Sequence, residues 1–93
     1  MDFPVTELEP RAAAVRATDD EVQVDLVDGR RLAVPLVWFP RLLHASDAQR
    51  GNFELIGDGE GIHWPDVDED ISVRGLLIGL PSVEYPPGTA QRA

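Results

Sequence analysis

The chain has 93 residues and a formal net charge of -9, because 17 acidic residues face only eight basic ones, all arginine, and it contains no cysteine. This length supports one domain with a single core and excludes a large enzyme, while the lack of cysteine excludes disulfides, thiolate metal sites and thiol redox chemistry. The negative charge opposes binding to nucleic acid and favours a neutral or basic partner, although acidity also keeps a protein soluble without any further role.

The N-terminal sequence MDFPVTELEP is acidic and interrupted by proline, whereas a secretion signal would be basic and then apolar. No apolar run approaches the ~20 residues that a membrane-spanning helix needs. We therefore expect a cytoplasmic protein that does not bind a membrane. Residues 1–11 show no clear hydrophobic period and are expected to form an extended lead-in to the domain.

Residues 12–18, AAAVRAT, predict a short strand, because the turn signal TDDE follows them closely. Beyond this turn, apolar and polar residues alternate over residues 22–26 and again over residues 32–36, on either side of Asp28-Gly29. This pattern predicts a β-hairpin.

The loop of this hairpin decides which residues face each other. A two-residue turn would place Val24 opposite Ala33 and would send Leu32 to the polar face. A three-residue loop over residues 27–29, with Gly29 in the left-handed conformation, places Val24 opposite Leu32 and keeps the apolar side chains on one face. We therefore predict the three-residue loop.

Two short helices are predicted after the hairpin. Pro35 cannot donate a hydrogen bond to a sheet, so the second strand should end there. Pro40 suits the first turn of a helix, in which the leucines that follow it turn inward. Ser46 and Gln49 have the spacing of a capping box, which predicts a second helix that ends near Gly51.

Residues 53–64 predict further strand structure. Residues 53–56 are typical of a strand, and GDGEG is typical of a loop. Residues 62–64 then continue that strand or pair with it, and Pro65 closes them.

The last element expected is a C-terminal helix, in which Ser72 is the N-cap and Pro81 marks the end. Its apolar residues fall at helical spacing: Val73, Leu76, Leu77 and Leu80. Residues 81–93 are expected to form a flexible tail containing proline and glycine. The expected fold class is α+β: a small single domain over residues 12–80, in which the hairpin and further short strands pack with short helices and the C-terminal helix.

The segment GIHWPDVDEDIS concentrates acids, which raises the question of a metal site. Asp66, Asp68 and Asp70 occupy the first three ligand positions of a calcium loop of the EF-hand type. Such a loop then needs glycine where this chain has Ile71, and glutamate where it has Leu77. We therefore predict no bound calcium.

The two histidines do not indicate zinc. His63 and His44 show no zinc-motif spacing, and no cysteine is present to complete a site. We expect no metal, no cofactor and a His63 that is exposed or hydrogen-bonded. The acids at 68–70 precede Ser72 and are expected to lead into the final helix, whose N-terminal end favours negative charge.

No catalytic motif is present. The chain lacks a GxSxG nucleophile elbow, and Ser46 and Ser72 are explained as helix caps. GDGEG lacks the strand-loop-helix setting and the basic residue of a phosphate-binding loop. We expect a protein that is not an enzyme and has no catalytic residues.

The sequence resembles a family of short bacterial proteins known as domain of unknown function 2442. The resemblance rests on three stretches: LVDGRRLAVPLVWFPRLLHAS, NFELIG and GIHWPDVDEDISVRGLLIG. The likeness runs in the same order from about Val22 to Gly79. It implies a compact α+β fold in which a hairpin precedes the Trp-Pro-Asp segment, and it implies no catalytic activity. Members of the family look like small modules that stand alone, join a helix-turn-helix domain, or accompany another small protein as toxins and antitoxins do.

Three hypotheses for the function follow. The first is a non-enzymatic interaction module whose acidic surface docks a neutral or basic protein, in a role such as that of an antitoxin or a regulator. Its expected partner-binding residues are His63, Trp64, Asp66, Asp68 and Glu69. The second is a regulator that contacts nucleic acid through arginines on a shared face: Arg30, Arg31, Arg41 and Arg50. The third is a metal-dependent activity at His63 and the acids, and the net charge favours the first hypothesis over both others.

Overall fold

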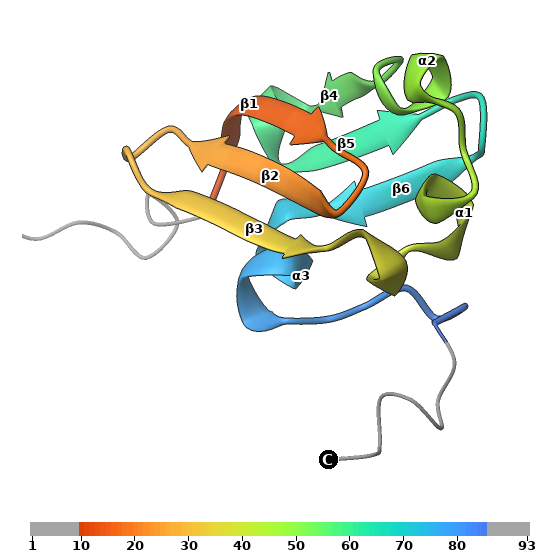
Figure 1. Cartoon of the computed structure of the whole chain (residues 1–93). Helices are drawn as coiled ribbons and strands as arrows, with labels where there is room; N and C mark the ends of the chain where they lie inside the picture. Colours follow the sequence, from red (N-terminus) through yellow and green to blue (C-terminus); the bar gives the residue numbers. More distant parts are fainter. Residues whose placement is uncertain (1–9, 86–93) are drawn as a thin grey trace, which may run out of the picture.

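The structure, a computed structural model, describes residues 10–85. They form two three-stranded antiparallel sheets, joined by short helices and followed by one more helix (Figure 1). The strands of sheet A are β1 Ala12–Ala17, β2 Glu21–Leu26 and β3 Arg31–Pro35, and those of sheet B are β4 Glu54–Ile56, β5 Gly61–Trp64 and β6 Glu69–Ser72. The α+β class is confirmed, while residues 1–9 of the expected lead-in lie outside the described residues.

The hairpin of sheet A has the predicted register. Val24 lies opposite Leu32. The Leu26 backbone N–H donates to the carbonyl of Arg30 at 2.7 Å, which encloses a three-residue loop. Gly29 has a φ of 96° within that loop, in the left-handed region. The alternation of β2 therefore sends its apolar residues to one buried face, as predicted.

We expect the substitution Gly29→Val to lower the free energy of unfolding by about 1–2 kcal/mol, because a side chain resists the left-handed conformation. No atom lies within 4 Å of the position that a Cβ would take at Gly29, so the effect is conformational and not a clash. Urea denaturation followed by circular dichroism measures the loss. Gly29→Asn is the matched control, since asparagine tolerates this conformation; equal losses for both variants would contradict the explanation.

Short helices connect the two sheets: η2 Leu36–Trp38, α1 Pro40–Leu43 and α2 Asp47–Arg50. Pro40 occupies the first turn of α1, as predicted. The predicted capping box of α2 is also present, because the Gln49 N–H donates to Ser46 Oγ at 3.1 Å and the Ser46 N–H donates to Gln49 Oε1 at 2.9 Å. These local signals place both helices within one or two residues of their predicted starts.

Strand β6 was not predicted from the sequence. The acids at 68–70 were expected to lead into the last helix, but Glu69 begins a strand in which Ile71 lies opposite Ile62 of β5. Burial alternates along β6, with Glu69 and Ile71 inside and Asp70 and Ser72 outside. This period of two indicates a strand, but the acids on both faces conceal it in the sequence.

The last helix, α3, spans Val73–Ile78 and is shorter than predicted. Ser72 is its N-cap, as predicted, and accepts a hydrogen bond from the Gly75 N–H at 2.9 Å. The helix ends at Gly79, whose φ of 84° makes it a left-handed C-cap, and not at Pro81. Leu80 therefore lies beyond the helix.

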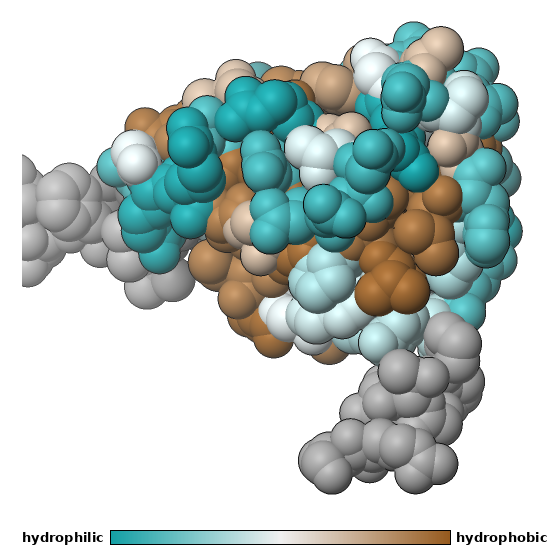
Figure 2. All heavy atoms as spheres, in the orientation of Figure 1, coloured by the Kyte–Doolittle hydropathy of each residue, from teal (hydrophilic) through white to brown (hydrophobic). Residues whose placement is uncertain are grey.

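Helix α3 buries a narrow stripe. Val73 and Leu76 are buried, whereas Leu77, Ile78 and Leu80 stay exposed. Figure 2 shows hydrophobic atoms gathered over α3 and again over η2, between more hydrophilic regions. Four apolar residues of this helix were expected to face the core, but only two do. The helix has six residues, so only one side of it packs against the sheets.

One core joins the two sheets. Its fully buried side chains come from both sheets and from the connecting helices: Val22, Val24, Leu36, Leu42, Ile62, Trp64 and Val73. Gly59 lies in the 3-10 turn η3 Gly57–Gly59, and its backbone lies directly against the backbone of Ala12. A Cβ at Gly59 would lie 2.5 Å from the carbonyl oxygen of Ala12 in β1, so the sheets meet there at a distance that only glycine permits.

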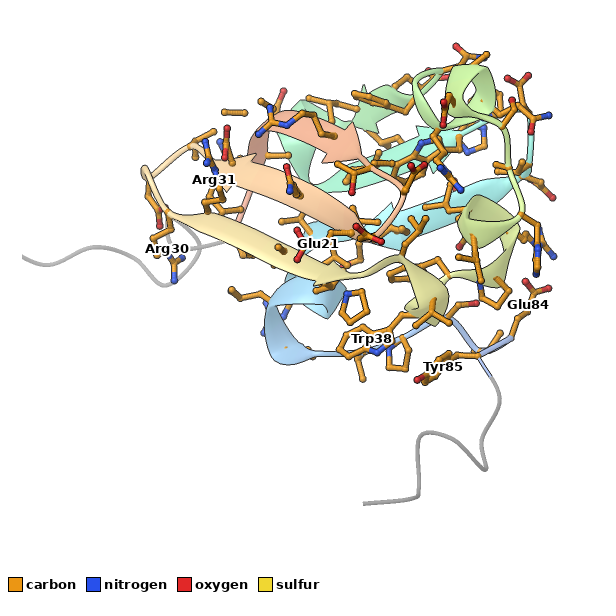
Figure 3. The ribbon with its side chains drawn as sticks, in the orientation of Figure 1. Glu21, Arg30, Arg31, Trp38, Glu84 and Tyr85 are labelled. Atoms are coloured by element: carbon orange, nitrogen blue, oxygen red, sulfur yellow. The ribbon has the colours of Figure 1, made fainter. Side chains whose placement is uncertain are left out.

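Residues 81–85 contact the domain. The Ser82 N–H donates to the carbonyl of Trp38 at 3.1 Å, and Glu84 pairs with Arg41 at 2.9 Å (Figure 3). Residues 86–93 lie outside the described residues, so a flexible tail stays a prediction. Within residues 10–85, no helix has the length and apolar character that crossing a membrane requires.

Candidate functional site

The outer face of sheet B is the surface that turns away from the core. Two rows of paired residues cross its three strands on this face. One row is Glu54, His63 and Asp70, and the next is Ile56, Gly61 and Ser72. Residues between them in sequence, such as Ile62 and Ile71, face the core instead. The row of Glu54, His63 and Asp70 therefore places one imidazole between two carboxylates.

His63 and Asp70 form the closest polar pair of this face, with 2.5 Å between His63 Nδ1 and Asp70 Oδ1. The Asp70 side chain is 70% exposed and that of His63 is 28% exposed. The carboxylate accepts from Nδ1 and holds the ring in place, so Nε2 is the nitrogen left to donate or accept elsewhere. This confirms the expectation of a hydrogen-bonded His63.

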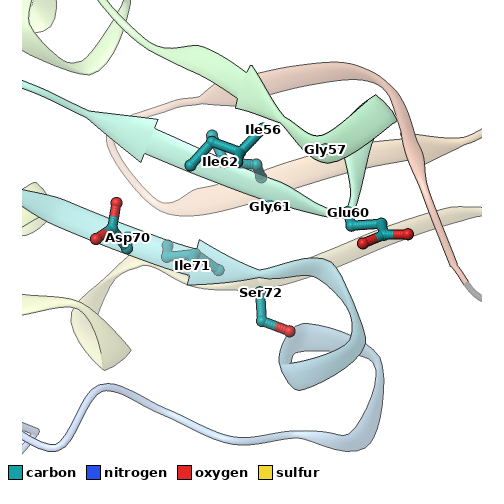
Figure 4. Close-up of a pocket in the computed structure, with 8 residues that line it drawn as sticks. All are labelled: Ile56, Gly57, Glu60, Gly61, Ile62, Asp70, Ile71 and Ser72. Atoms are coloured by element: carbon teal, nitrogen blue, oxygen red, sulfur yellow. The ribbon is translucent and has the colours of Figure 1, made fainter.

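A hollow of about 400 Å³ lies beside this row, where Gly61 has no side chain (Figure 4). A Cβ at Gly61 would come 3.7 Å from the Cβ of Ile56, so the glycine leaves open space that a side chain would partly fill. Glu60 and Asp70 lie on either side of the apolar residues in this hollow. The hollow thus combines an apolar wall with carboxylates, which suits a cation on an aliphatic stem.

The turn between β5 and β6 carries two of the predicted site residues. Asp66 accepts a hydrogen bond from Asn52 Nδ2 at 3.0 Å. Asp68 has a φ of 53°, its backbone carbonyl accepts from Arg41 Nη1 at 2.7 Å, and its side chain is 87% exposed. Both carboxylates therefore reach the surface at the end of sheet B.

Trp64 and Glu69 point inward instead. Trp64 is fully buried, its Nε1 donates to the carbonyl of Arg50 at 2.9 Å, and its ring centroid lies 5.9 Å from that of Phe53. Glu69 lies opposite Trp64 and is 9% exposed. Burial raises the pKa of Glu69, and the nearby charge of Arg41 lowers it in part. Of the five predicted residues, His63, Asp66 and Asp68 are thus accessible to a docking partner.

Sequence reasoning missed the contribution of Glu54, Glu60 and Gly61, and it gave Asp70 a different role. Glu54 reaches the site only because β4 pairs with β5. One signal in the sequence was available: in a strand, successive side chains point to opposite faces. In GIHW this places Trp64 and His63 on opposite faces, and in EDIS it does the same for Glu69 and Asp70.

The four arginines do not share a face, contrary to the suggestion from sequence. Arg30 and Arg31 lie at the hairpin end of sheet A, whereas Glu84, the partner of Arg41, lies at the other end of the molecule (Figure 3). Each is paired with an acid: Arg30 with Asp28 at 2.9 Å, Arg31 with Asp25 at 2.5 Å, Arg41 with Glu84 at 2.9 Å and Arg50 with Asp19 at 2.8 Å. A basic patch made of these four residues is therefore excluded.

Among residues 10–85, no three histidine or acidic side chains come together as a metal ion would require. Asp66 and Asp70 of the partial calcium motif are instead engaged with Asn52 and His63. The expectation of no bound metal stays a prediction.

The comparisons with known proteins agree with this fold. The sequence model of the family described as Protein of unknown function (DUF2442) matches residues 12–82. A crystal structure of a protein of unknown function from Rhodospirillum rubrum ATCC 11170 is 38% identical, covers 82% of this chain and 94% of that chain, and has a TM-score of 0.71. A solution NMR structure of an uncharacterized protein from Chromobacterium violaceum is 20% identical, covers 96% of this chain and 84% of that chain, and also has a TM-score of 0.71, which shows the fold alone. Among curated proteins none matched.

Proposed function

This chain belongs to the family described as Protein of unknown function (DUF2442), and from that premise we propose that it is a non-enzymatic interaction module that binds a basic segment of a protein partner. The partner docks on the outer face of sheet B. The observation that carries the proposal is the row of Glu54, His63 and Asp70 beside the hollow at Gly61. A role such as that of an antitoxin or a regulator is consistent with such binding.

Charge supports a basic partner. The net charge is -9, and four of the eight arginines form ion pairs away from this face. The carboxylates of the outer face therefore sit in a negative field, which attracts a cationic surface and speeds its approach.

Shape supports an extended segment with lysine or arginine side chains. The hollow gives an aliphatic stem an apolar wall at Ile56, and a carboxylate at either end, that of Glu60 or that of Asp70, can pair with the cation at its tip. Strand β4 lies at the edge of sheet B, and all three of its residues are exposed. An edge strand of this kind can add a further strand from a partner.

The same geometry supports a role without catalysis. Ser72, the hydroxyl nearest to Asp70 along β6, already accepts the capping hydrogen bond of α3. His63 is fixed by Asp70, and the pair has no nucleophile hydrogen-bonded to it among the described residues. The acids paired with the arginines likewise oppose binding to nucleic acid, because phosphate contacts would have to displace them.

The test is the rate of association with a partner captured from the native host, identified by mass spectrometry and then purified. We expect the double variant Glu54→Gln, Asp70→Asn to associate about tenfold more slowly than the wild type at low salt, because steering by these charges is lost. The difference should shrink as salt screens the charges.

The matched control is Asp20→Asn, Glu21→Gln at the start of strand β2 in sheet A, which removes one aspartate and one glutamate from a different part of the surface. It should associate at a rate close to that of the wild type. Equal slowing by both double variants would show that net charge alone matters and would contradict docking on the outer face of sheet B.

A further inference from the structure

A second hollow lies along the free edge of β6, on the side of the C-terminal segment. It has a volume of about 300 Å³, at the lower end of the range for small-molecule sites, and is bounded by β6, Phe39 and residues 80–83. Phe39, Ile71 and Leu80 give it apolar walls. We call this space the β6 groove.

Two acidic residues line the β6 groove, Glu69 and Asp70, and Glu69 is the buried one, at 9% exposed. A carboxylate taken out of water is unfavourable unless a cation or several hydrogen bonds compensate it. Burial accordingly raises the pKa of Glu69.

The nearest cation does not provide that compensation directly. Arg41 Nε and Nη2 donate to the Glu84 carboxylate, at 3.0 and 2.9 Å. Arg41 Nη1 donates to the backbone carbonyl of Asp68 at 2.7 Å. The Glu69 carboxylate accepts a hydrogen bond from the Asp70 backbone N–H, and Arg41 acts on it through its charge and not through a hydrogen bond. The groove therefore holds a buried acid whose natural partner, a cation, is engaged elsewhere.

We propose that the β6 groove binds a ligand that carries an aliphatic primary ammonium, whose charge pairs with Glu69 and whose stem lies against Phe39, Ile71 and Leu80. The same chemistry is offered by a free alkylamine and by a lysine side chain. The β6 groove shares Asp70, Ile71 and Ser72 with the hollow of sheet B, whereas Glu69, Phe39 and Leu80 line the β6 groove and not that hollow. A test at Glu69 therefore separates this proposal from docking on the outer face.

The other polar groups of the groove fit an ammonium better than a metal ion. Ser72 and Ser82 line the groove, and each hydroxyl oxygen accepts one backbone hydrogen bond, from Gly75 and Glu84 respectively, and keeps a second lone pair. An ammonium has three N–H donors, which the Glu69 carboxylate, the Ser82 hydroxyl and solvent water can accept. Ser72 lies on the opposite face of β6 from Glu69 and borders the groove without sharing the same cation. A metal ion would need several charged ligands, and no group of three is present among residues 10–85.

The experiment is an NMR titration of the ¹⁵N-labelled protein with n-pentylammonium chloride, at ionic strength matched with sodium chloride. We expect saturable shifts of the amides that line the groove, with a dissociation constant in the millimolar range typical of so small a ligand. The neutral analogue n-pentanol should bind at least about tenfold more weakly, because it lacks the charge. Nα-acetyl-lysine methylamide tests the second source of the ammonium.

The variant Glu69→Gln keeps the shape of the side chain and should weaken binding of n-pentylammonium at least about tenfold. The control Glu60→Gln, in the hollow of sheet B, should leave the affinity unchanged. A carbon-detected titration of the Glu69 carboxyl in the wild type gives a readout that needs no variant, since bound ammonium should lower its pKa.

Three results would overturn the proposal: n-pentanol binding as tightly as n-pentylammonium, unchanged affinity in Glu69→Gln, or shifts confined to the outer face of sheet B. Tighter binding of the lysine derivative than of n-pentylammonium would support a lysine side chain as the natural ligand, and the reverse order would support a free amine.

Discussion

Replacing Trp64 with alanine is expected to lower the free energy of unfolding by about 3–5 kcal/mol, the usual range for removing a large aromatic side chain from a core. Trp64 is fully buried and contacts the ring of Phe53. Its Nε1 also donates to the carbonyl of Arg50 at 2.9 Å, so the change leaves a cavity and an unpaired carbonyl together. A domain of this size is stable by only about 5–15 kcal/mol, so much of the total would be lost.

Urea denaturation followed by circular dichroism measures this effect. The natural control is Trp38→Ala, because Trp38 packs against the core from its margin and is only partly buried. Its loss should be clearly smaller. If Trp38→Ala were the more damaging change, the centre of the core would lie nearer to η2 than the structure places it.

The second large effect is expected for Arg50→Met, which keeps an apolar stem and removes the guanidinium. Arg50 Nε donates to the carbonyl of Leu42 at 3.0 Å, and Nη2 donates to that of Leu43 at 2.9 Å. These carbonyls lie at the C-terminal end of helix α1, where the Leu42 carbonyl also accepts from the Ala45 N–H at 3.1 Å. The arginine therefore acts as a cap supplied from α2. Removing the guanidinium takes the Arg50 donor from both carbonyls and leaves that of Leu42 only its backbone partner, which should lower the free energy of unfolding by about 1–3 kcal/mol.

The ion pair of Arg50 contributes much less. Asp19, at 2.8 Å, has a side chain that is 84% exposed, so water screens the pair. Asp19→Asn should therefore change the stability by less than about 1 kcal/mol, as measured by the same urea titration. A loss in Asp19→Asn as large as that in Arg50→Met would assign the effect to the charge pair and contradict the capping explanation.

The hairpin register and the capping of α2 could be predicted because their signals are local. Gly29 fixes a loop within three residues, and Ser46 and Gln49 recognise each other across one helical turn. Strand β6 could not be predicted in this way, because Glu69 lies on the buried face, where the pattern of a strand requires an apolar residue. The prediction that the acids at 68–70 only lead into the last helix rested on their charge and not on the alternation of their side chains.

The candidate sites were less predictable, because long-range pairing assembles them. Glu54 meets His63 only through the β4–β5 ladder. The β6 groove brings Phe39 together with Glu69 and Leu80, which lie far apart in the sequence. No spacing rule connects such residues. The alternation of GIHW does place Trp64 on the inner face, so its prediction as a partner-binding residue was avoidable.

The order of the strands bears on how the chain reaches this structure. Sheet A and sheet B each pair strands that are consecutive in the sequence, so each meander can form while closing only short loops. Contacts of low sequence separation form quickly, and the joining of the two meanders is the step that must bring distant segments together. Gly59 against Ala12 lies at that junction. We therefore expect the local pairing within each meander to form before the two meanders dock, and a substitution at Gly59 to act on the docking step.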